Sequence, residues 1–293
     1  MIRYQAAALA LKAFSAGAPA RTCYRWLGNQ LRDGGTIDVD SYAAKAAWLI
    51  SSVGDMRRVG VAAEIGTGWI HFYGIVLSLA GVPRVDLHDV WDNRQLLRLK
   101  RAFYGFENRL GDIGIPKSEH ASAKRKLKVI AETSNFEEIY RELGLNYWVA
   151  PIKPKNYDLV CSVDVIEHVD ANALPSFIRT MYDALAAGGL SLHQIGLDDH
   201  LTHYDPCAST KQYLAIPERR WRRWYQNRVQ YFNRIPLERL RQMFVDARFE
   251  VIESSASIDE RALDGLIVAP QFLGQSRESL LATRAYFIHR KPL

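Results

Sequence analysis

Cysteine is scarce in this sequence, and long apolar runs are absent. Only three of the 293 residues are cysteines, and no two of them form a Cys-x-x-Cys pair. Cysteines that are few, odd in number and widely spaced exclude a disulfide framework and a thiolate zinc site, and they are typical of a reducing cytosol. No apolar stretch approaches the length that crosses a bilayer. We therefore expect a cytoplasmic protein.

The sequence also lacks a strong excess of either charge. Its formal net charge is +6, with 24% charged and 48% hydrophobic residues, as in ordinary globular chains. A mild basic excess is compatible with an anionic partner and equally with a solvated face. At this length the chain can form one large domain, or one domain with a sizeable insertion. None of these numbers indicates the oligomeric state.

Acidic residues are missing from the N-terminal segment. None precedes Asp33, whereas the first 21 residues carry Arg3, Lys12 and Arg21. Such a composition fits a transit peptide, a membrane-surface helix or a helix that packs on the domain. The apolar core of the segment, residues 6–11, is short for a secretory signal and ends at a lysine. We expect a packing helix, and peripheral membrane contact stays open.

From residue 59 onward, short apolar strands alternate with amphipathic helices. The clearest helix begins near Leu174, with Asn172 as its cap and Gly188–Gly189 as its end. This alternation predicts an α/β fold with a doubly wound, Rossmann-like, mostly parallel sheet and an antiparallel last strand. The strands that we expect are 59–64, 84–89, 145–150, 157–163, 190–195, 249–254 and 284–289.

Two segments, 91–145 and 197–235, hold more chain than such a core requires. Long excursions in compact domains are usually lids or binding elements. We therefore expect three parts. They are an N-terminal helical segment (1–55), a Rossmann-like domain (56–196 and 236–293) and a lid insertion for substrate recognition (197–235).

Glycines mark the turn after the first predicted strand, in VAAEIGTGWI. Ligands bind beyond the carboxyl ends of parallel strands, and Gly66 and Gly68 would let a ligand approach the backbone there. Asp89, at the end of the next strand, is placed to accept the hydroxyls of an adenosine ribose. Glu64 would repel a pyrophosphate but suits a cationic ligand, and His71 replaces the third glycine of the dinucleotide motif. S-adenosylmethionine, with its ammonium and sulfonium groups, fits this pattern; an ordinary tight turn is the alternative.

The stretches EIGTGW, YDLVCSVDVIEHV and LAAGGLSLHQI, together with Asp89, resemble the class I S-adenosylmethionine-dependent methyltransferases. The resemblance covers about residues 56–196 and resumes through the final strands. Ile70 departs from it at the third glycine of E-x-G-x-G-x-G, and the acidic residue that often follows the third strand is missing. The resemblance implies that the cofactor contacts are Glu64, Gly66, Gly68, Asp89, Ser162, Val163 and Asp164.

Histidines and aspartates crowd the loop after the fifth predicted strand, LHQIGLDDHLTHYD. Methyl transfer to a hydroxyl needs a base or a metal that removes the proton, and a histidine oriented by a carboxylate is the usual base. We expect His200, paired with Asp199, to be this base, with His193 as the second choice. A divalent cation could bind the same cluster, but the spacing matches no ligand motif, so we predict no metal-binding residues. The alternative for the loop residues is that they are polar side chains facing solvent. Three residues after the fourth predicted strand have another alternative, which is to cap that strand and the following helix: Asp164, Glu167 and His168.

The predicted lid combines arginines with aromatic side chains in PERRWRRWYQNRVQYFNRIP. Arginine suits phosphates and carboxylates, and aromatic faces suit sugar rings or bases. On a helix, Trp221 and Trp224 would share a face. The alternative is that the aromatics pack the lid onto the sheet while the arginines face solvent. The substrate-binding residues that we expect are His203, Tyr204, Trp221, Trp224 and Arg222.

The loop and lid also resemble a subgroup of methyltransferases found with glycan and saccharide biosynthesis, in which HxIDLxDH precedes the lid. The counterpart here is HQIGLDDH, with Gly196 in place of the acid. The resemblance implies O-methylation of a saccharide or a similar small hydroxylated molecule. An RNA methyltransferase that uses the basic lid and a non-catalytic, cofactor-binding partner protein are the alternatives. The chain has no N-P-P-Y-type amine site and no separate RNA-binding module, which argues against nucleic acid.

Overall fold

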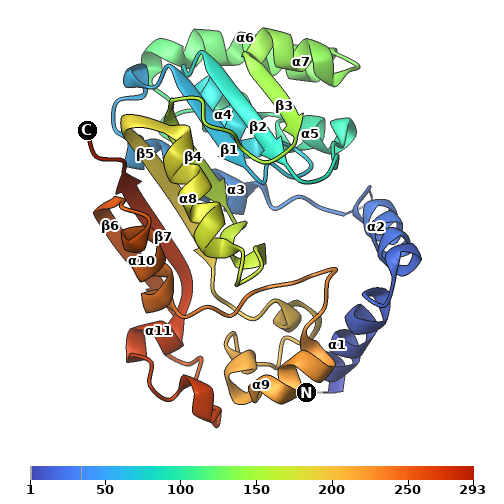
Figure 1. Cartoon of the computed structure of the whole chain (residues 1–293). Coiled ribbons are helices and arrows are strands. Elements are labelled where there is room, and N and C mark those ends of the chain that lie inside the picture. Colours follow the sequence, from blue (N-terminus) through green and yellow to red (C-terminus); the bar gives the residue numbers. More distant parts are fainter. Residues whose placement is uncertain (1, 34) are drawn as a thin grey trace.

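The structure, a computed structural model, describes residues 2–33 and 35–293. In this part of the chain, strands form one sheet in the order β3-β2-β1-β4-β5-β7-β6 (Figure 1). Strands β1 to β5 pair in parallel, and β7 runs antiparallel to β5 and β6, so the predicted fold class is confirmed. The strands are β1 (Val61–Ile65), β2 (Arg84–Asp89), β3 (Leu145–Val149), β4 (Tyr157–Val163), β5 (Leu185–Gly196), β6 (Glu250–Ile258) and β7 (Ala282–Arg290).

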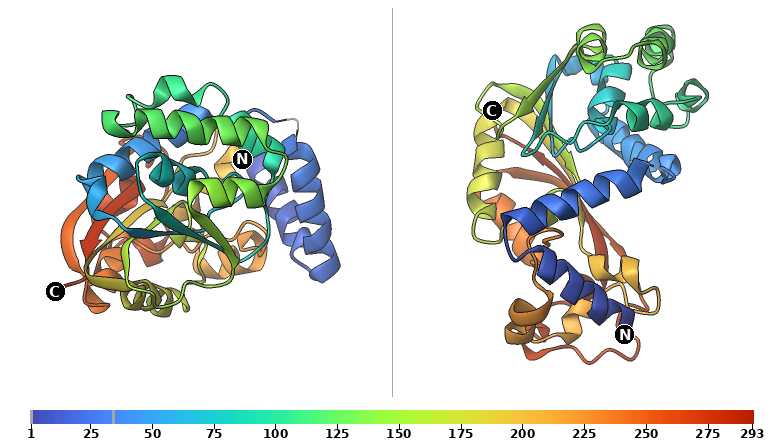
Figure 2. Two further views of the ribbon diagram at one scale, coloured as in Figure 1. Left: turned by 90° about the horizontal axis from the view of Figure 1, so that it is seen from above. Right: turned by 90° about the vertical axis from the view of Figure 1, so that its right-hand side faces the viewer.

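Helices cover both faces of the sheet (Figures 1 and 2). Successive side chains of a strand point to opposite faces, so Ala62 and Cys161 join one apolar cluster while Ala63 and Val160 join the other. The first cluster lies under α3 (Val39–Val53), α4 (Phe72–Leu79), α5 (Leu96–Ala102), α6 (His120–Glu132) and α7 (Phe136–Leu143). The second lies under α8 (Leu174–Ala184) and α10 (Leu237–Asp246).

Helix α8 buries Leu174, Ile178, Met181 and Ala184 at helical spacing, as its sequence predicts. Both of its expected ends are wrong, however. The cap position is Ala173, without a side-chain hydrogen bond, in place of Asn172. Residues Gly188–Gly189 lie inside β5, opposite an irregularity at Tyr157. A Cβ on Gly189 would lie 2.8 Å from the Tyr157 carbonyl oxygen, so Gly189 serves close strand pairing, and Gly188 has left-handed backbone (φ 77°) within the strand.

A third part of the molecule, the lid layer, lies beyond the carboxyl ends of the strands (Figure 1). It consists of α1 (Ile2–Phe14), residues 197–235 and residues 259–281, which share one apolar cluster. The expected insertion 197–235 is therefore only one of its components. Its short elements are the 3₁₀ helices η5 (His200–Tyr204), η6 (Gln212–Ala215) and η8 (Pro270–Phe272), α9 (Glu218–Arg220), the π-helix η7 (Trp221–Tyr225) and α11 (Arg277–Leu281).

The N-terminal helix packs on this layer and not on the sheet. Tyr4, Ala8 and Leu11 are buried in the cluster that the lid layer forms. Helices α1 and α2 (Ala18–Asp33) run along one side of the molecule, from the lid layer toward the sheet (Figure 2, right). None of the described helices combines the length and the apolar character that crossing a membrane requires.

Candidate functional site

The turn after β1 depends on two glycines with left-handed backbone, Gly66 (φ 72°) and Gly68 (φ 63°). The Gly66 N–H donates to the His88 carbonyl oxygen at 2.7 Å, and a Cβ on Gly66 would overlap the side chain of Val165. A Cβ on Gly68 would meet no atom within 4 Å. Gly66 is thus required by packing, whereas Gly68 borders open space that a ligand can enter.

Asp89 joins the end of β2 to this turn. Its Oδ2 accepts from the Gly68 N–H at 2.9 Å, and its Oδ1 accepts from the N–H groups of Val90 at 2.7 Å and Trp91 at 3.2 Å. Burial raises the pKa of the Asp89 carboxyl, although the backbone donors act in the opposite direction. The carboxylate lies where the sequence predicts a ribose contact, at the carboxyl end of the second strand. The contact itself stays a prediction.

Glu64 is turned beneath the glycine turn, which corrects its expected role. Its side chain is 2% exposed, and its Oε2 accepts from the Thr67 hydroxyl at 3.0 Å and the Gly74 N–H at 2.8 Å. Burial raises the pKa of Glu64 to about 7. His71, where a dinucleotide motif has glycine, extends this network through Thr67 and Tyr140. Glu64 therefore anchors the start of α4 and does not face a ligand's ammonium group.

Ser162 and His193 are paired on the face of the sheet that α10 covers. The Ser162 hydroxyl lies 2.7 Å from His193 Nδ1, and the Ser191 hydroxyl lies 2.7 Å from Nε2. The His193 ring packs against Phe244 of α10, and burial lowers its pKa to about 3. Alternation along β5 points this side chain to the α10 face, so His193 is a buried structural residue. Val163, a third expected contact, belongs to the core cluster under α3 and α4.

Asp164 begins the loop after β4 and faces the space above the sheet. Its backbone is left-handed (φ 55°), and its carboxylate forms ion pairs with Lys45 of α3 and Arg284 of β7. Burial opposes ionisation of Asp164, but the two cations outweigh burial and lower its pKa. The sequence did not indicate Lys45 or Arg284, because they come from distant elements.

A cavity of about 620 Å³ lies between the carboxyl ends of the strands and the lid layer. It adjoins a second cavity of about 260 Å³ that reaches Trp69 in the glycine turn and Asn93. Trp91 and Arg228 line both cavities. The walls of the larger one carry both signs of charge, histidines and aromatic rings: Lys45, Asp164, Glu167, His168, Asp198, His200, His203, Tyr231 and Arg284. Of the expected site residues, Asp164, His200 and His203 lie here.

His200 faces this cavity, but its expected pairing with Asp199 does not form. Asp199 is fully buried and directs Oδ2 to the Tyr4 hydroxyl at 2.5 Å and Oδ1 to the Leu201 N–H at 2.9 Å. It therefore caps η5 and joins it to α1. The His200 ring lies 5.0 Å from the His168 ring, and burial together with His168 lowers the pKa of His200 to about 4. His200 is thus a neutral imidazole at pH 7.

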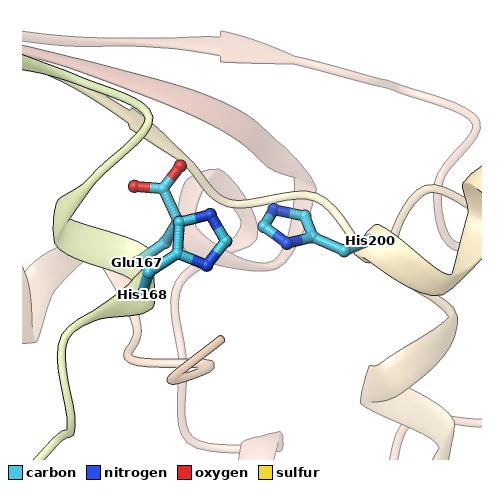
Figure 3. Close-up of side chains that lie close together, drawn as sticks. All are labelled: Glu167, His168 and His200. Atoms are coloured by element: carbon cyan, nitrogen blue, oxygen red, sulfur yellow. The ribbon is translucent and has the colours of Figure 1, made fainter. Parts of the chain in front are cut away.

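Glu167 and His168 complete a cluster with His200 (Figure 3). His168 Nδ1 donates to the Tyr231 carbonyl oxygen at 2.6 Å. Glu167 is 3% exposed; its Oε1 accepts from the Gly196 N–H at 2.9 Å, and its Oε2 has no partner. Burial raises the pKa of Glu167 to about 8. Neither side chain caps α8, the helix that follows.

Gly196 lies against the Glu167 carboxyl group. A Cβ at position 196 would lie 2.6 Å from Glu167 Oε1, closer than real Cβ contacts come. The acid that the family pattern expects before Leu197 would therefore displace the Glu167 carboxylate. This departure from the pattern has a direct structural reason.

The expected substrate residues of the lid line neither cavity, with the exception of His203. Trp221 is buried in the lid layer, stacked on Tyr225 at 5.7 Å and covered by the Arg234 guanidinium at 4.2 Å. The wider turn of a π-helix separates residues three apart, so Trp224 is exposed while Trp221 is not. Arg222 bonds Glu218 on the surface. Trp221 and Arg222 line a separate cavity of about 410 Å³, and Trp224 lines one of about 280 Å³. Tyr204 lines neither of the two cavities beside the glycine turn.

Comparisons with known proteins give a family match. A family model described as "Methyltransferase domain" matches residues 62–254. Phosphoethanolamine N-methyltransferase 2 of Haemonchus contortus, in complex with S-adenosyl-L-methionine, is 15% identical, with a TM-score of 0.46 over 85% of this chain and 53% of that one. An O-methyltransferase family protein of Burkholderia thailandensis is 12% identical, with a TM-score of 0.46 over 97% of this chain and 64% of that one. Both likenesses are weak. No curated protein sequence gives a significant match.

Proposed function

The chain belongs to the methyltransferase-domain family, and from that premise we propose that it transfers a methyl group from S-adenosylmethionine to a hydroxyl of a saccharide or a similar small molecule. The family confirms the enzyme class and the cofactor that the sequence predicts. The acceptor, the atom and the residues that act on it are the proposal. The observation that carries it is the polar cavity of about 620 Å³ beside the glycine turn, with His200 in its wall.

The residues around the turn fit the cofactor. Open space next to Gly68 admits a ligand against bare backbone, and Asp89 is held at the strand end where ribose hydroxyls find an acceptor. Trp69 and Trp91 line the adjoining cavity, where a flat adenine ring can stack. When bound, the cofactor supplies a methyl group on a sulfonium, which leaves as a neutral thioether when the methyl bonds to the acceptor oxygen. Glu64, which is buried, takes no part in this proposal.

In the proposed reaction, His200 takes the proton of the acceptor hydroxyl as the methyl group is transferred, and the Asp198 and Asp164 charges, which oppose the lowering of its pKa, stabilise the imidazolium. Neither of its ring nitrogens has a hydrogen-bond partner among the described residues, so one is free to take that proton. The proton passes to solvent through the open cavity as the C–O bond forms. Alignment of the acceptor oxygen with the methyl group is the main contribution of the cavity walls.

The composition of the walls favours a hydroxylated acceptor. Asp164 and Asp198 are acceptors for hydroxyl donors, and Trp91 and Tyr231 offer aromatic faces of the kind that contact sugar rings. Lys45 and Arg228 suit an acidic group on the acceptor. An RNA acceptor has less support, because Trp221, Tyr225 and Phe232 are buried in the lid layer, which leaves few of the lid's aromatic faces for bases to stack on.

The test uses purified protein and S-adenosylmethionine labelled on the methyl group. We expect label to enter a saccharide pool and not tRNA. His200→Ala should lower turnover by roughly 10²- to 10⁴-fold with little change in affinity for S-adenosylhomocysteine, as loss of a base does. His120→Ala, which replaces a histidine outside both cavities, is the matched control. Labelling of tRNA alone, or unchanged turnover in His200→Ala, would contradict the proposal.

A further inference from the structure

We propose that Glu167, His168 and His200 bind a divalent cation of the first transition row in the wall of the large cavity. The cation would have protein ligands on one side and the cavity on the other. Its binding can be tested without the proposed reaction, but it occupies His200, so a bound cation would replace the free imidazole in that reaction; its role in activating an acceptor hydroxyl rests on the proposed function.

The three side chains converge from two separate elements. Glu167 and His168 belong to the 3₁₀ turn η4 (Ile166–His168) after β4, and His200 begins η5. One potential ligand atom from each lies within 4.8 Å of the others. Figure 3 shows the two imidazole rings directed toward one another, with the carboxylate beside them. Ligands of a tetrahedral ion at about 2.1 Å are about 3.4 Å apart, so small side-chain rotations would complete the site.

An unpartnered buried oxygen indicates that something is missing from this cluster. Glu167 is 3% exposed, and its Oε2 has no hydrogen-bond partner. A buried carboxyl oxygen without a partner is costly, and a coordinated cation would satisfy it as the carboxyl proton leaves to solvent. His200 likewise has no partner for its ring nitrogens among the described residues. These groups are available as ligands without breaking any existing contact.

The outer contacts of the cluster hold it in the form that a cation requires. The His168 Nδ1–H donates to the Tyr231 carbonyl oxygen, which leaves a lone pair on Nε2. The other oxygen of Glu167 is held by the Gly196 N–H. Metal-binding histidines commonly donate their second N–H to a carbonyl in this way, and metal-binding carboxylates are commonly held by a further donor.

The ligand set defines the kind of cation. Two imidazoles and one carboxylate bind Zn²⁺, Co²⁺ or Mn²⁺ and leave positions open, whereas Mg²⁺ prefers oxygen ligands only. An acceptor hydroxyl at an open position would lose its proton more readily, as metal-bound water does. The cation would then act in place of a free His200 as the group that activates the acceptor.

The test measures metal binding by itself. Wild-type protein is stripped with a chelator and titrated with Co²⁺, whose visible absorption reports coordination by nitrogen and oxygen. We expect one Co²⁺ per chain, displaced by Zn²⁺ and not by equimolar Mg²⁺. Glu167→Gln, which keeps the acceptor for the Gly196 N–H, and His200→Ala should each weaken binding at least about tenfold. Their thermal unfolding is measured alongside to establish that they are folded.

His120→Ala is the matched control, because His120 bonds the Ile115 carbonyl oxygen outside the cavity. It should bind Co²⁺ as the wild type does. Absence of Co²⁺ binding by the wild type, or wild-type affinity in both folded cluster variants, overturns the inference. A parallel titration with S-adenosylhomocysteine distinguishes the two proposals. If the protein binds S-adenosylhomocysteine but no metal, only the cation site is refuted. If it binds the metal but not S-adenosylhomocysteine, only the proposed reaction is refuted.

Discussion

Gly66 and Gly68 have the same backbone conformation but different surroundings. Both adopt a left-handed φ, which an L-residue enters at a cost of about 1–2 kcal/mol. Only at Gly66 does an added Cβ also overlap a neighbour, the side chain of Val165. Gly68 borders the space that the proposal assigns to the cofactor. The motif thus divides into one glycine for folding and one for ligand access.

We predict that Gly66→Ala and Gly68→Ala separate stability from binding. Gly66→Ala should lower the free energy of unfolding by about 2–4 kcal/mol, since strain and overlap add. Gly68→Ala should cost about 1 kcal/mol but weaken S-adenosylhomocysteine binding at least about tenfold, because its methyl group enters the cofactor space. Urea unfolding and calorimetry measure the two effects. Equal losses of stability, or wild-type affinity in Gly68→Ala, would count against this division.

At the scale of residues, sequence patterns located the turn but not the direction of each side chain. Gly66, Gly68 and Asp89 lie where the motif predicts. Glu64 and His193 point into the interior, because each has a buried partner that the sequence does not identify, namely the Gly74 N–H and Ser162. The charge of a residue near a motif is therefore weaker evidence that it contacts a ligand than its position at the end of a strand.

At the scale of elements, the lid layer is fixed to the sheet by a buried lysine. Lys211 is 1% exposed, and its Nζ donates to the carbonyl oxygens of Leu197 at 2.8 Å and Ala282 at 2.7 Å, and to the Tyr213 hydroxyl at 3.0 Å. Leu197 is where the chain leaves β5, and Ala282 is where β7 begins. One side chain thus joins two of the three direct connections between strands and the lid layer; the third follows Ile258 at the end of β6. Burial lowers the pKa of Lys211 to about 7.

We predict that Lys211→Met lowers the free energy of unfolding by about 2–4 kcal/mol, because buried carbonyl groups lose their donor. The difference in free energy of unfolding between the wild type and the variant should grow with pH. Between about pH 7 and pH 10 the unfolded chain keeps the lysine proton and the folded chain does not, so wild-type stability rises with pH by up to about 1.4 kcal/mol per unit. The variant lacks this gain. Denaturation at pH 7, 8 and 9 measures the difference, and parallel pH profiles would refute the assignment.

The difference between local and long-range contacts explains why the sheet could be predicted from the sequence and the lid layer could not. Alternating strands and helices are local patterns, and they gave the fold class and the antiparallel end. The lid layer depends on contacts such as that between the Tyr4 N–H and Asp205, which are 201 positions apart. Its residues 197–235 also contain a π-helix, which turns Trp224 outward although its spacing from Trp221 suggests a shared face. Local periodicity carries no information about either feature.

At the scale of the whole molecule, the cavity exists because the two layers meet at the carboxyl edge of the sheet. Lys45 from α3, Asp164 after β4, His200 after β5 and Arg284 from β7 reach it from separate elements. The sequence indicated Asp164, which the resemblance places directly after a predicted strand, and His200, which lies in the histidine- and aspartate-rich loop after the next strand. The basic residues and the closeness of His168 to His200 follow only from the folded arrangement.

The most direct test of the account is a calorimetric titration of the full chain with S-adenosylhomocysteine, followed by competition with NADH. The account predicts saturable binding of one molecule per chain, unaffected by NADH, because the turn holds a nucleoside and not a pyrophosphate. Absence of binding by folded protein, or displacement by NADH at equal concentration, would contradict it.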